Sequence, residues 1–161
     1  MSSQITHYIN GKRVAGTSGR SAAVFNPATG QQSATVALAS KEEVRAVVAS
    51  SSAAHEAWAN TTPLRRSRIL NKFLAILEER QDELAAAITA EHGKVLSDAK
   101  GEVQRGLEVV EFATGAPQLL KGEITEDVGT RVDSHAVRQP LGVVAGITPF
   151  NFPAMVPMWM F

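Results

Sequence analysis

An apolar stretch without a single charged residue covers residues 143–161, and no other feature limits so strongly what this chain can fold into. Its length would suit a membrane-spanning helix. It contains three prolines and Asn151, however, which would leave backbone hydrogen-bonding groups unpaired in lipid. We therefore expect a buried strand over residues 142–147, of the kind found at the centre of a parallel sheet, and a new helix whose first turn contains Pro153.

The first forty residues are predicted to form a small antiparallel unit of short strands and tight turns. Asn10-Gly11 joins residues 7–9 (HYI) to residues 12–14 (KRV) and is the strongest short-range signal of a hairpin. Proline and glycine favour a second turn over residues 26–30 (NPATG), between a short strand at residues 24–25 and another over residues 32–38.

Two helices are predicted next, each from its capping residues. Ser40 and Glu43 form a capping box that starts a helix at Lys41. Thr62 as cap and Pro63 as first residue start the second. The spacing of apolar residues predicts buried faces: Val44, Val47, Val48, Ala54 and Trp58 in the first helix, and Leu64, Ile69, Leu70, Phe73, Leu74 and Leu77 in the second.

Two more helices and two strands follow. A helix over residues 82–92 is expected to end at Gly93. Another, capped by Ser97 or Asp98, should run to about residue 113 and end at Gly115 and Pro117. After Lys121 the alternation changes to a period of two, which predicts strands over residues 123–127 and 131–139.

Composition excludes several classes of function. Sixteen basic residues balance sixteen acidic ones, which gives no electrostatic reason to expect nucleic acid or an anionic membrane as partner. The sequence has no cysteine, and its four histidines are scattered without ligand spacing, so we expect no metal site. The first residues show neither a secretory nor a transit segment, and a cytoplasmic location is expected.

Asn151 is the candidate for chemistry. It follows the predicted strand and its proline turn, and ligands of α/β sheets bind beyond the carboxyl ends of strands. A neutral amide donor at that place could stabilise developing negative charge on oxygen, as an oxyanion hole does. The alternative is that Asn151 caps the following helix and that Phe150 and Phe152 belong to the core.

Residues 138–144 (RQPLGVV) and 147–153 (ITPFNFP) together resemble the signature of the aldehyde dehydrogenase superfamily. The resemblance continues through residues 8–12 (YINGK), 26–30 (NPATG) and 91–94 (EHGK). Phe150, where most members have Trp, and residues 101–111 (GEVQRGLEVVE) are similar to the methylmalonate-semialdehyde dehydrogenase branch.

The resemblance implies a role for five residues. Asn151 would hold the thiohemiacetal oxygen together with the backbone N–H of a catalytic cysteine that this sequence lacks. Thr148, Pro149 and Phe150 would lie against the nicotinamide-ribose end of NAD. Arg105 would bind the substrate carboxylate, which a bidentate guanidinium does well; the alternative is an ordinary solvated arginine on a helix.

The fold class implied is α/β, the N-terminal part of the aldehyde dehydrogenase fold. Residues 1–120 would form hairpins and helices of the NAD-binding domain, residues 121–140 strands of the oligomerisation region, and residues 141–161 the start of the Rossmann-like core. Because the chain stops inside an apolar stretch, we expect it to be truncated and inactive by itself.

The implied reaction is covalent. A cysteine thiolate would add to a (methyl)malonate semialdehyde, hydride would pass to NAD, and coenzyme A would take the acyl group with loss of carbon dioxide. A homo-oligomer, a dimer of dimers, is the expected assembly. Two alternatives are a hydrolytic aldehyde dehydrogenase and a non-catalytic assembly module built on the strands after Lys121.

Overall fold

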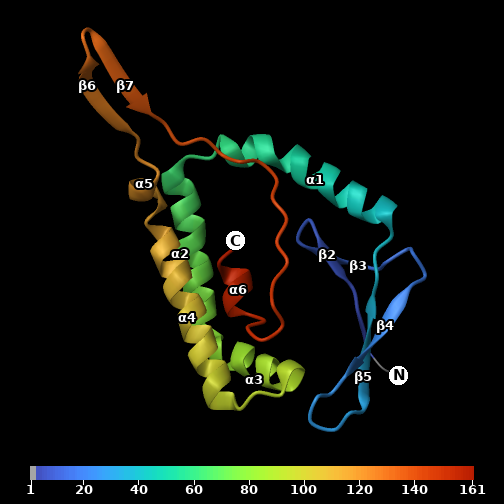
Figure 1. The fold of residues 1–161 in the computed structure, drawn as a ribbon. Coiled ribbons are helices and arrows are strands. Elements are labelled where there is room, and N and C mark those ends of the chain that lie inside the picture. Colours follow the sequence, from blue (N-terminus) through green and yellow to red (C-terminus); the bar gives the residue numbers. More distant parts are fainter. Residues whose placement is uncertain (1–2) are drawn as a thin grey trace.

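The computed structural model describes residues 3–161. The strands are β1 (Ser3–Ile5), β2 (His7–Ile9), β3 (Lys12–Val14), β4 (Ser21–Phe25), β5 (Gln32–Ala37), β6 (Glu123–Gly129) and β7 (Val132–Ala136). The helices are α1 (Lys41–Ala59), α2 (Pro63–Glu79), α3 (Gln81–His92), α4 (Leu96–Thr114), α5 (Ala116–Leu119) and α6 (Met155–Met158). Figure 1 shows the strands at the two ends of the molecule and the helices between them.

The predicted N-terminal hairpin and turn are confirmed, but the unit is not wholly antiparallel. Asn10 and Gly11 both have positive φ, 51° and 71°, as the tight turn between β2 and β3 requires. β4 pairs antiparallel with β5, whereas β1 pairs parallel with β5 on its other edge. Period-two patterns cannot predict this, because they fix which face a residue occupies and not which strand lies beside it.

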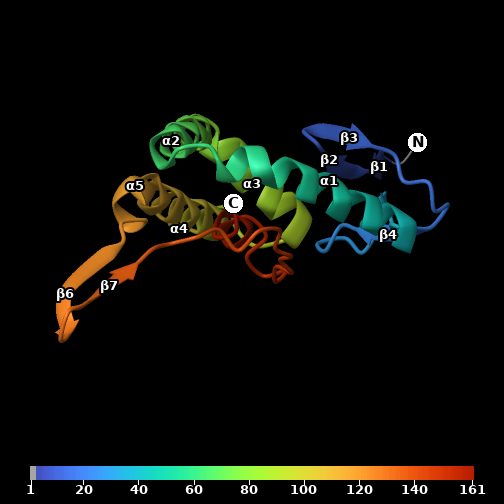
Figure 2. The same ribbon diagram turned by 90° about the horizontal axis from the view of Figure 1, so that it is seen from above.

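Helix α1 begins where its capping residues predict, yet its apolar face is not buried. The Ser40 hydroxyl accepts from the Glu43 N–H, and the Glu43 carboxylate accepts from the Ser40 N–H. Val44, Val48 and Trp58 are about half exposed, and α1 buries no residue. Figures 1 and 2 show why: α1 lies across one side of the molecule, away from the α2–α4 pair.

The core lies where α2, α3, α4 and α6 meet. It contains Ala85, Ile88, Ala99, Val103, Leu107, Val110, Ala154 and Met158, with Phe73, Leu74, Leu77 and Leu84 packed against it. The predicted buried face of α2 is therefore correct for its last turns. It is wrong for Leu64 and Ile69, which are about half exposed because nothing packs against that side of the helix in residues 3–161.

The ends of α3 and α4 show two confirmed predictions and one correction. Gly93 ends α3 with a left-handed φ of 85°, which favours glycine. Ser97 and Asp98 do not cap α4; Val95 is at the cap position without a side-chain hydrogen bond, and both polar residues lie inside the first turn. The predicted end of α4 is confirmed: the helix ends at Thr114 with Gly115 at the cap position, and Pro117 follows in the first turn of the short helix α5.

Strands β6 and β7 form a hairpin that projects away from the helices (Figures 1 and 2). Every residue of both strands is exposed. The second strand ends at Ala136, before the predicted residue 139.

The predicted central strand over residues 142–147 is not formed. This segment is extended but unpaired, and Ile147 is 97 % exposed. A central strand of a parallel sheet needs a neighbouring strand on each edge, and no strand in residues 3–161 lies beside this segment. The helix predicted with Pro153 in its first turn begins two residues later, at Met155.

Within the described residues, no helix is long and apolar enough to cross a membrane.

Candidate active site around Asn151

Glu102 is a carboxylate on the buried face of α4. Its neighbours on that face are apolar, Ala99 and Val103 among them, and its own side chain is 0 % exposed. A buried charge of this kind is stable only when it is paired and hydrogen-bonded. Its partners come from two places distant in sequence, the segment after α3 and the segment that enters α6.

Both oxygens of Glu102 accept hydrogen bonds. Oε1 accepts from the backbone N–H of Ala154 at 2.8 Å and of Met155 at 3.1 Å. Oε2 accepts from Nζ of Lys94 at 2.7 Å. These two N–H groups belong to the start of α6, where backbone donors have no partner inside the helix. Glu102 therefore supplies the cap that Asn151 was one candidate to provide.

Lys94 joins this carboxylate to Asn151. Its Nζ also donates to the backbone carbonyl oxygen of Asn151 at 2.8 Å and lies 4.8 Å from the centre of the Phe152 ring. The Lys94 side chain is 12 % exposed. The ammonium is thus held among an anion, a carbonyl and an aromatic face, each of which favours a positive charge.

The pKa of the Glu102 carboxyl reflects opposing influences. Burial favours the neutral form and acts to raise the pKa, while the Lys94 ammonium and the Ala154 and Met155 N–H groups act to lower it. The net pKa is lowered from its ordinary value. Glu102 is therefore ionised near neutral pH, and it acts as a fixed acceptor.

Asn151 is exposed, and its backbone is anchored by Lys94. Its side-chain amide forms no hydrogen bond to residues 3–161, and α6 begins four residues later with Ala154 at the cap position. Asn151 is therefore not a helix cap. An anchored residue with an unengaged amide in solvent can donate to a ligand.

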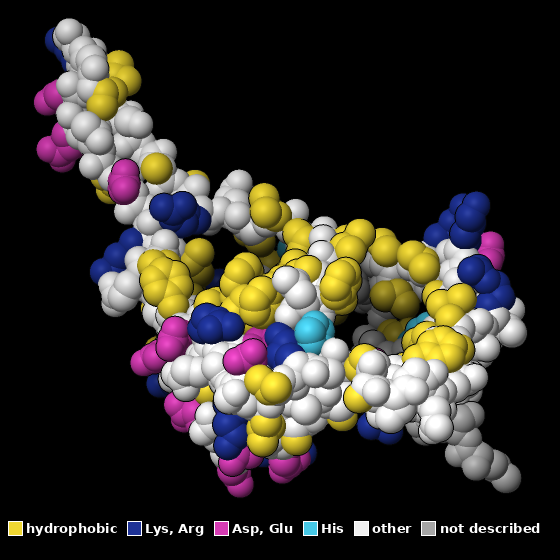
Figure 3. Space-filling view, turned by 60° about the horizontal axis from the view of Figure 1, so that its bottom comes forward, with side chains coloured by type: hydrophobic (Ala, Val, Ile, Leu, Met, Phe, Trp, Pro, Cys, Tyr) yellow, Lys and Arg dark blue, Asp and Glu magenta, His cyan; other side chains and the backbone are white. Residues whose placement is uncertain are grey.

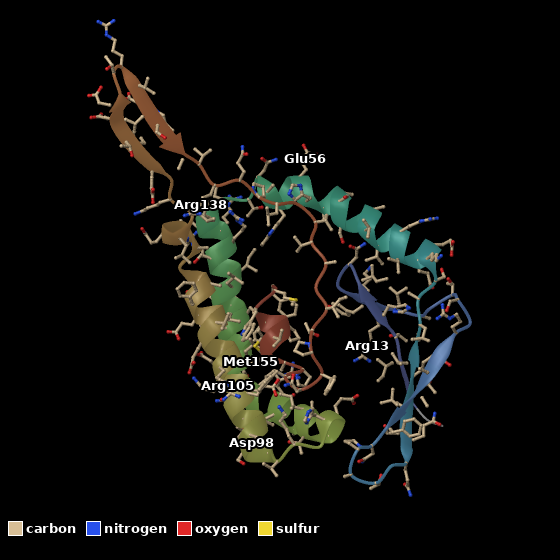
Figure 4. The ribbon with its side chains drawn as sticks, viewed as in Figure 1. Arg13, Glu56, Asp98, Arg105, Arg138 and Met155 are labelled. Carbon is tan, nitrogen blue, oxygen red and sulfur yellow. The ribbon has the colours of Figure 1, made fainter. Side chains whose placement is uncertain are left out.

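The remaining predicted site residues lie on two sides of this segment. Thr148, Pro149 and Phe150 precede Asn151 in an exposed loop, and Phe150 is 88 % exposed. Arg105 lies on α4 beside the entry to α6, close to Met155 (Figure 4), and its guanidinium carbon is 5.7 Å from the Phe152 ring centre. Asn151 and Arg105 thus come from separate elements, and Arg105 lies against the ring of Phe152, the residue that follows Asn151.

Lys94 and Glu102 were not among the predicted site residues. The position of Glu102 could have indicated its burial. It lies three residues after Ala99 and four before Gly106, and this spacing places it on the buried face of the helix. Lys94 lies outside both helices and has no such spacing; its signal is its place in residues 91–94 (EHGK), one of the segments that resemble the family. Among residues 3–161 there is no cluster of side chains that could hold a metal ion.

The model of the aldehyde dehydrogenase family matches residues 14–161, and the chain belongs to this family. It is 49 % identical over 155 residues to malonate-semialdehyde dehydrogenase of Pseudomonas aeruginosa, with 96 % of this chain and 31 % of that protein covered. It is 52 % identical over 157 residues to malonate-semialdehyde dehydrogenase 3 of Geobacillus kaustophilus, covering 98 % and 32 %.

Solved structures agree with the sequence relatives. A protein of Sinorhizobium meliloti assigned as methylmalonate-semialdehyde dehydrogenase, complexed with NAD, superposes with a TM-score of 0.93 at 53 % identity, covering 99 % of this chain and 32 % of that one. The methylmalonate-semialdehyde dehydrogenase of Oceanimonas doudoroffii gives 0.92 at 50 % identity, with the same coverage. The chain thus has the α/β fold of the N-terminal part of these enzymes and spans about a third of their length.

Proposed function

We propose that this chain supplies half of an oxyanion hole, one end of an NAD site and a carboxylate-binding arginine to a semialdehyde dehydrogenase. The observation that supports this most directly is Asn151, whose backbone is anchored by Lys94 while its amide is open to a ligand. Family membership and 49–53 % identity to malonate- and methylmalonate-semialdehyde dehydrogenases support the substrate class.

Asn151 would act when a thiolate adds to the aldehyde carbon. The carbonyl π electrons move to oxygen, and the side-chain NH2 of Asn151 donates to the oxyanion that forms. The sequence contains no cysteine, so the thiolate would belong to the remaining part of a full-length enzyme. NAD, when bound, would accept the hydride that leaves the same carbon and so convert the adduct to a thioester.

The loop before Asn151 fits the nicotinamide end of NAD. Phe150 offers an aromatic face that is 88 % exposed, and Thr148 offers a hydroxyl beside it. In residues 3–161 no side chain covers Phe150, so a flat ring could lie against this loop. We propose Thr148, Pro149 and Phe150 as its contacts.

Arg105 would bind the substrate carboxylate. It is exposed and lies against the ring of Phe152, the residue that follows Asn151. Its guanidinium can hold a carboxylate through two parallel hydrogen bonds. The C–C bond to the carboxylate would then break, releasing carbon dioxide and leaving an enolate of the thioester, which takes up a proton from water at the α-carbon. The thiol of coenzyme A would finally displace the enzyme thiolate and take the acyl group.

The division of the chain follows the same proposal. Residues 1–120 would belong to the NAD-binding domain, residues 121–140 to the oligomerisation region and residues 141–161 to the Rossmann-like core. The projecting β6–β7 hairpin exposes Ile124, Val128 and Val132. We propose that it pairs with other copies in a dimer of dimers, which a monomeric mass of the full-length enzyme in solution would contradict.

Replacing Asn151 with Ala in the full-length enzyme tests the catalytic role. We expect the rate of acylation to fall by about 10²–10³, because one oxyanion donor is lost. NAD affinity should change little, since the amide faces the reacting carbonyl. Pre-steady-state formation of NADH measures the first quantity and equilibrium titration the second. Equal losses of both would show that Asn151 is structural.

A further inference from the structure

The geometry points to Lys94 and Glu102 as positioning residues that fix residues 151–155 and thereby aim the Asn151 amide. This inference rests on the proposed role of Asn151 in the oxyanion hole. It assigns a function to a buried ion pair that binds the backbone of Asn151 but not its side-chain amide.

The pair holds the segment at both ends. At the first end, the Lys94 ammonium binds the carbonyl oxygen of Asn151. At the other end, Glu102 binds the N–H groups of Ala154 and Met155. The Phe152 ring lies between them, 4.8 Å from the Lys94 Nζ. One ion pair therefore determines where the backbone of Asn151 lies relative to α4.

A contribution to stability alone does not account for this arrangement. Glu102 is fully buried and Lys94 is 12 % exposed, so both lose most of their hydration. Apolar residues of similar volume are often as stabilising as a buried ion pair, or more so. They could not bind a carbonyl oxygen and two N–H groups at once. The pair provides directional contacts that apolar packing lacks.

Lys94 itself is not placed to take part in the chemistry. Two of its three N–H groups are directed to Glu102 and to the Asn151 carbonyl. Its effect on the reaction must pass through Asn151. A displacement of about 1 Å at a catalytic group can cost about 10² in rate, so loss of the anchor should be costly but less so than loss of the Asn151 amide.

A double-mutant cycle in the full-length enzyme tests this. Lys94→Met keeps the length of the side chain and removes its charge. We expect the rate constant of the NADH burst to fall about ten- to a hundredfold, with NAD affinity within about twofold of wild type. In the Asn151→Ala background, Lys94→Met should lower the burst by less than about threefold, because residues that act as a unit are not additive.

Two further variants control for folding. Lys100→Met removes an exposed ion pair between α4 and α3, Lys100 to Asp82 at 2.8 Å, and should keep the wild-type burst. Glu102→Gln keeps an oxygen for the Ala154 and Met155 N–H groups but loses the anion beside Lys94. It should also slow the burst, and it replaces Lys94→Met in the cycle if that variant does not fold.

The outcomes separate the inference from the function on which it rests. A wild-type burst in Lys94→Met, or losses that add fully to those of Asn151→Ala, would overturn the positioning role alone. A wild-type burst in Asn151→Ala would overturn the proposed oxyanion hole itself. Partial recovery in Lys94→Arg, which restores a cation with several donors, supports positioning by charge and hydrogen bonding.

Discussion

At the residue scale, Glu102 has the largest influence on how the candidate site is built. Where α4 contacts α6, the core residues are apolar, and the Glu102 carboxylate lies among them and binds two backbone N–H groups. Removing one partner of such a buried pair typically destabilises a protein by about 3–5 kcal/mol, because the other charge is left uncompensated. The site and the core therefore share a residue.

Arg105 provides a prediction about specificity. Arg105→Lys keeps the charge but loses the bidentate geometry, and Arg105→Met loses both. For malonate semialdehyde we expect kcat/KM to fall about tenfold in the first variant and about a hundredfold in the second, since hydrogen bonds to charged groups contribute about 1.5–3 kcal/mol. Steady-state kinetics with propanal, which has no carboxylate, is the control. Equal losses with both aldehydes would show that Arg105 is not a carboxylate ligand.

The sequence indicated the candidate site only in part. Asn151 could be predicted because it lies in residues 147–153, which resemble a family signature. The structure leaves its side-chain amide available as a donor. Lys94 and Glu102 were missed because their importance depends on contacts across more than fifty residues, from Lys94 to Asn151 and from Glu102 to Ala154. No local pattern encodes such a contact.

At the scale of the element, the junction before α1 depends on the charge of Glu43. Its carboxylate accepts from the Ser40 N–H at 2.7 Å and from the Thr17 N–H at 2.6 Å. These hydrogen bonds, the Ser40 one first, lower the pKa of Glu43 to about 2. One side chain thus caps the helix and attaches the preceding loop to it.

The pKa of Glu43 predicts an acid sensitivity. The folded pKa of about 2 lies below the ordinary value of 4.5, so the stabilisation is complete above pH 4.5 and is lost as the pH falls toward 2. Glu43→Gln should lower the unfolding midpoint of the enzyme at neutral pH, and the difference from wild type should vanish in this acid range. The exposed neighbour variant Glu42→Gln serves as control. A difference that does not depend on pH would contradict the prediction.

Most caps and turns were predicted correctly because they are local; the cap of α4 was the exception. The starts of α1 and α2 and the end of α3 each depend on residues within four positions. The strand predicted over residues 142–147 was wrong for this chain, although its apolar composition is typical of a central strand. Strand formation depends on neighbours, and composition does not show whether these are present.

At the scale of the whole molecule, the exposed hydrophobic surface is extensive. Figure 3 shows hydrophobic side chains gathered across the middle of one face. Leu141, Val144 and Ile147 are 70–97 % exposed. The apolar side chains of α1, Val44, Val48 and Trp58 among them, are about half exposed. The chain spans about a third of the length of its relatives, and we propose that the remaining part of a full-length enzyme covers this surface.

The proposed reaction predicts both the products and their amounts. The full-length enzyme, given methylmalonate or malonate semialdehyde with NAD, should form an acyl-CoA and carbon dioxide in amounts equal to the NADH produced. Omitting CoA should reduce steady turnover strongly, because the thioester then has no acceptor thiol. Chromatography of the products identifies the acyl carrier. Release of a free acid without CoA would instead favour a hydrolytic aldehyde dehydrogenase.

The link between Glu102 and the start of α6 has a consequence for synthesis on the ribosome. The amide partners of this carboxylate lie 52 and 53 residues further along the chain. While α4 is leaving the exit tunnel, Ala154 and Met155 have yet to be translated, and Lys94 is the partner that the growing chain already offers to the carboxylate. Until they emerge, Oε1 has only water to bind. Completing the hydrogen bonds of Glu102 and setting the Asn151 backbone in place therefore both wait for residues 151–155.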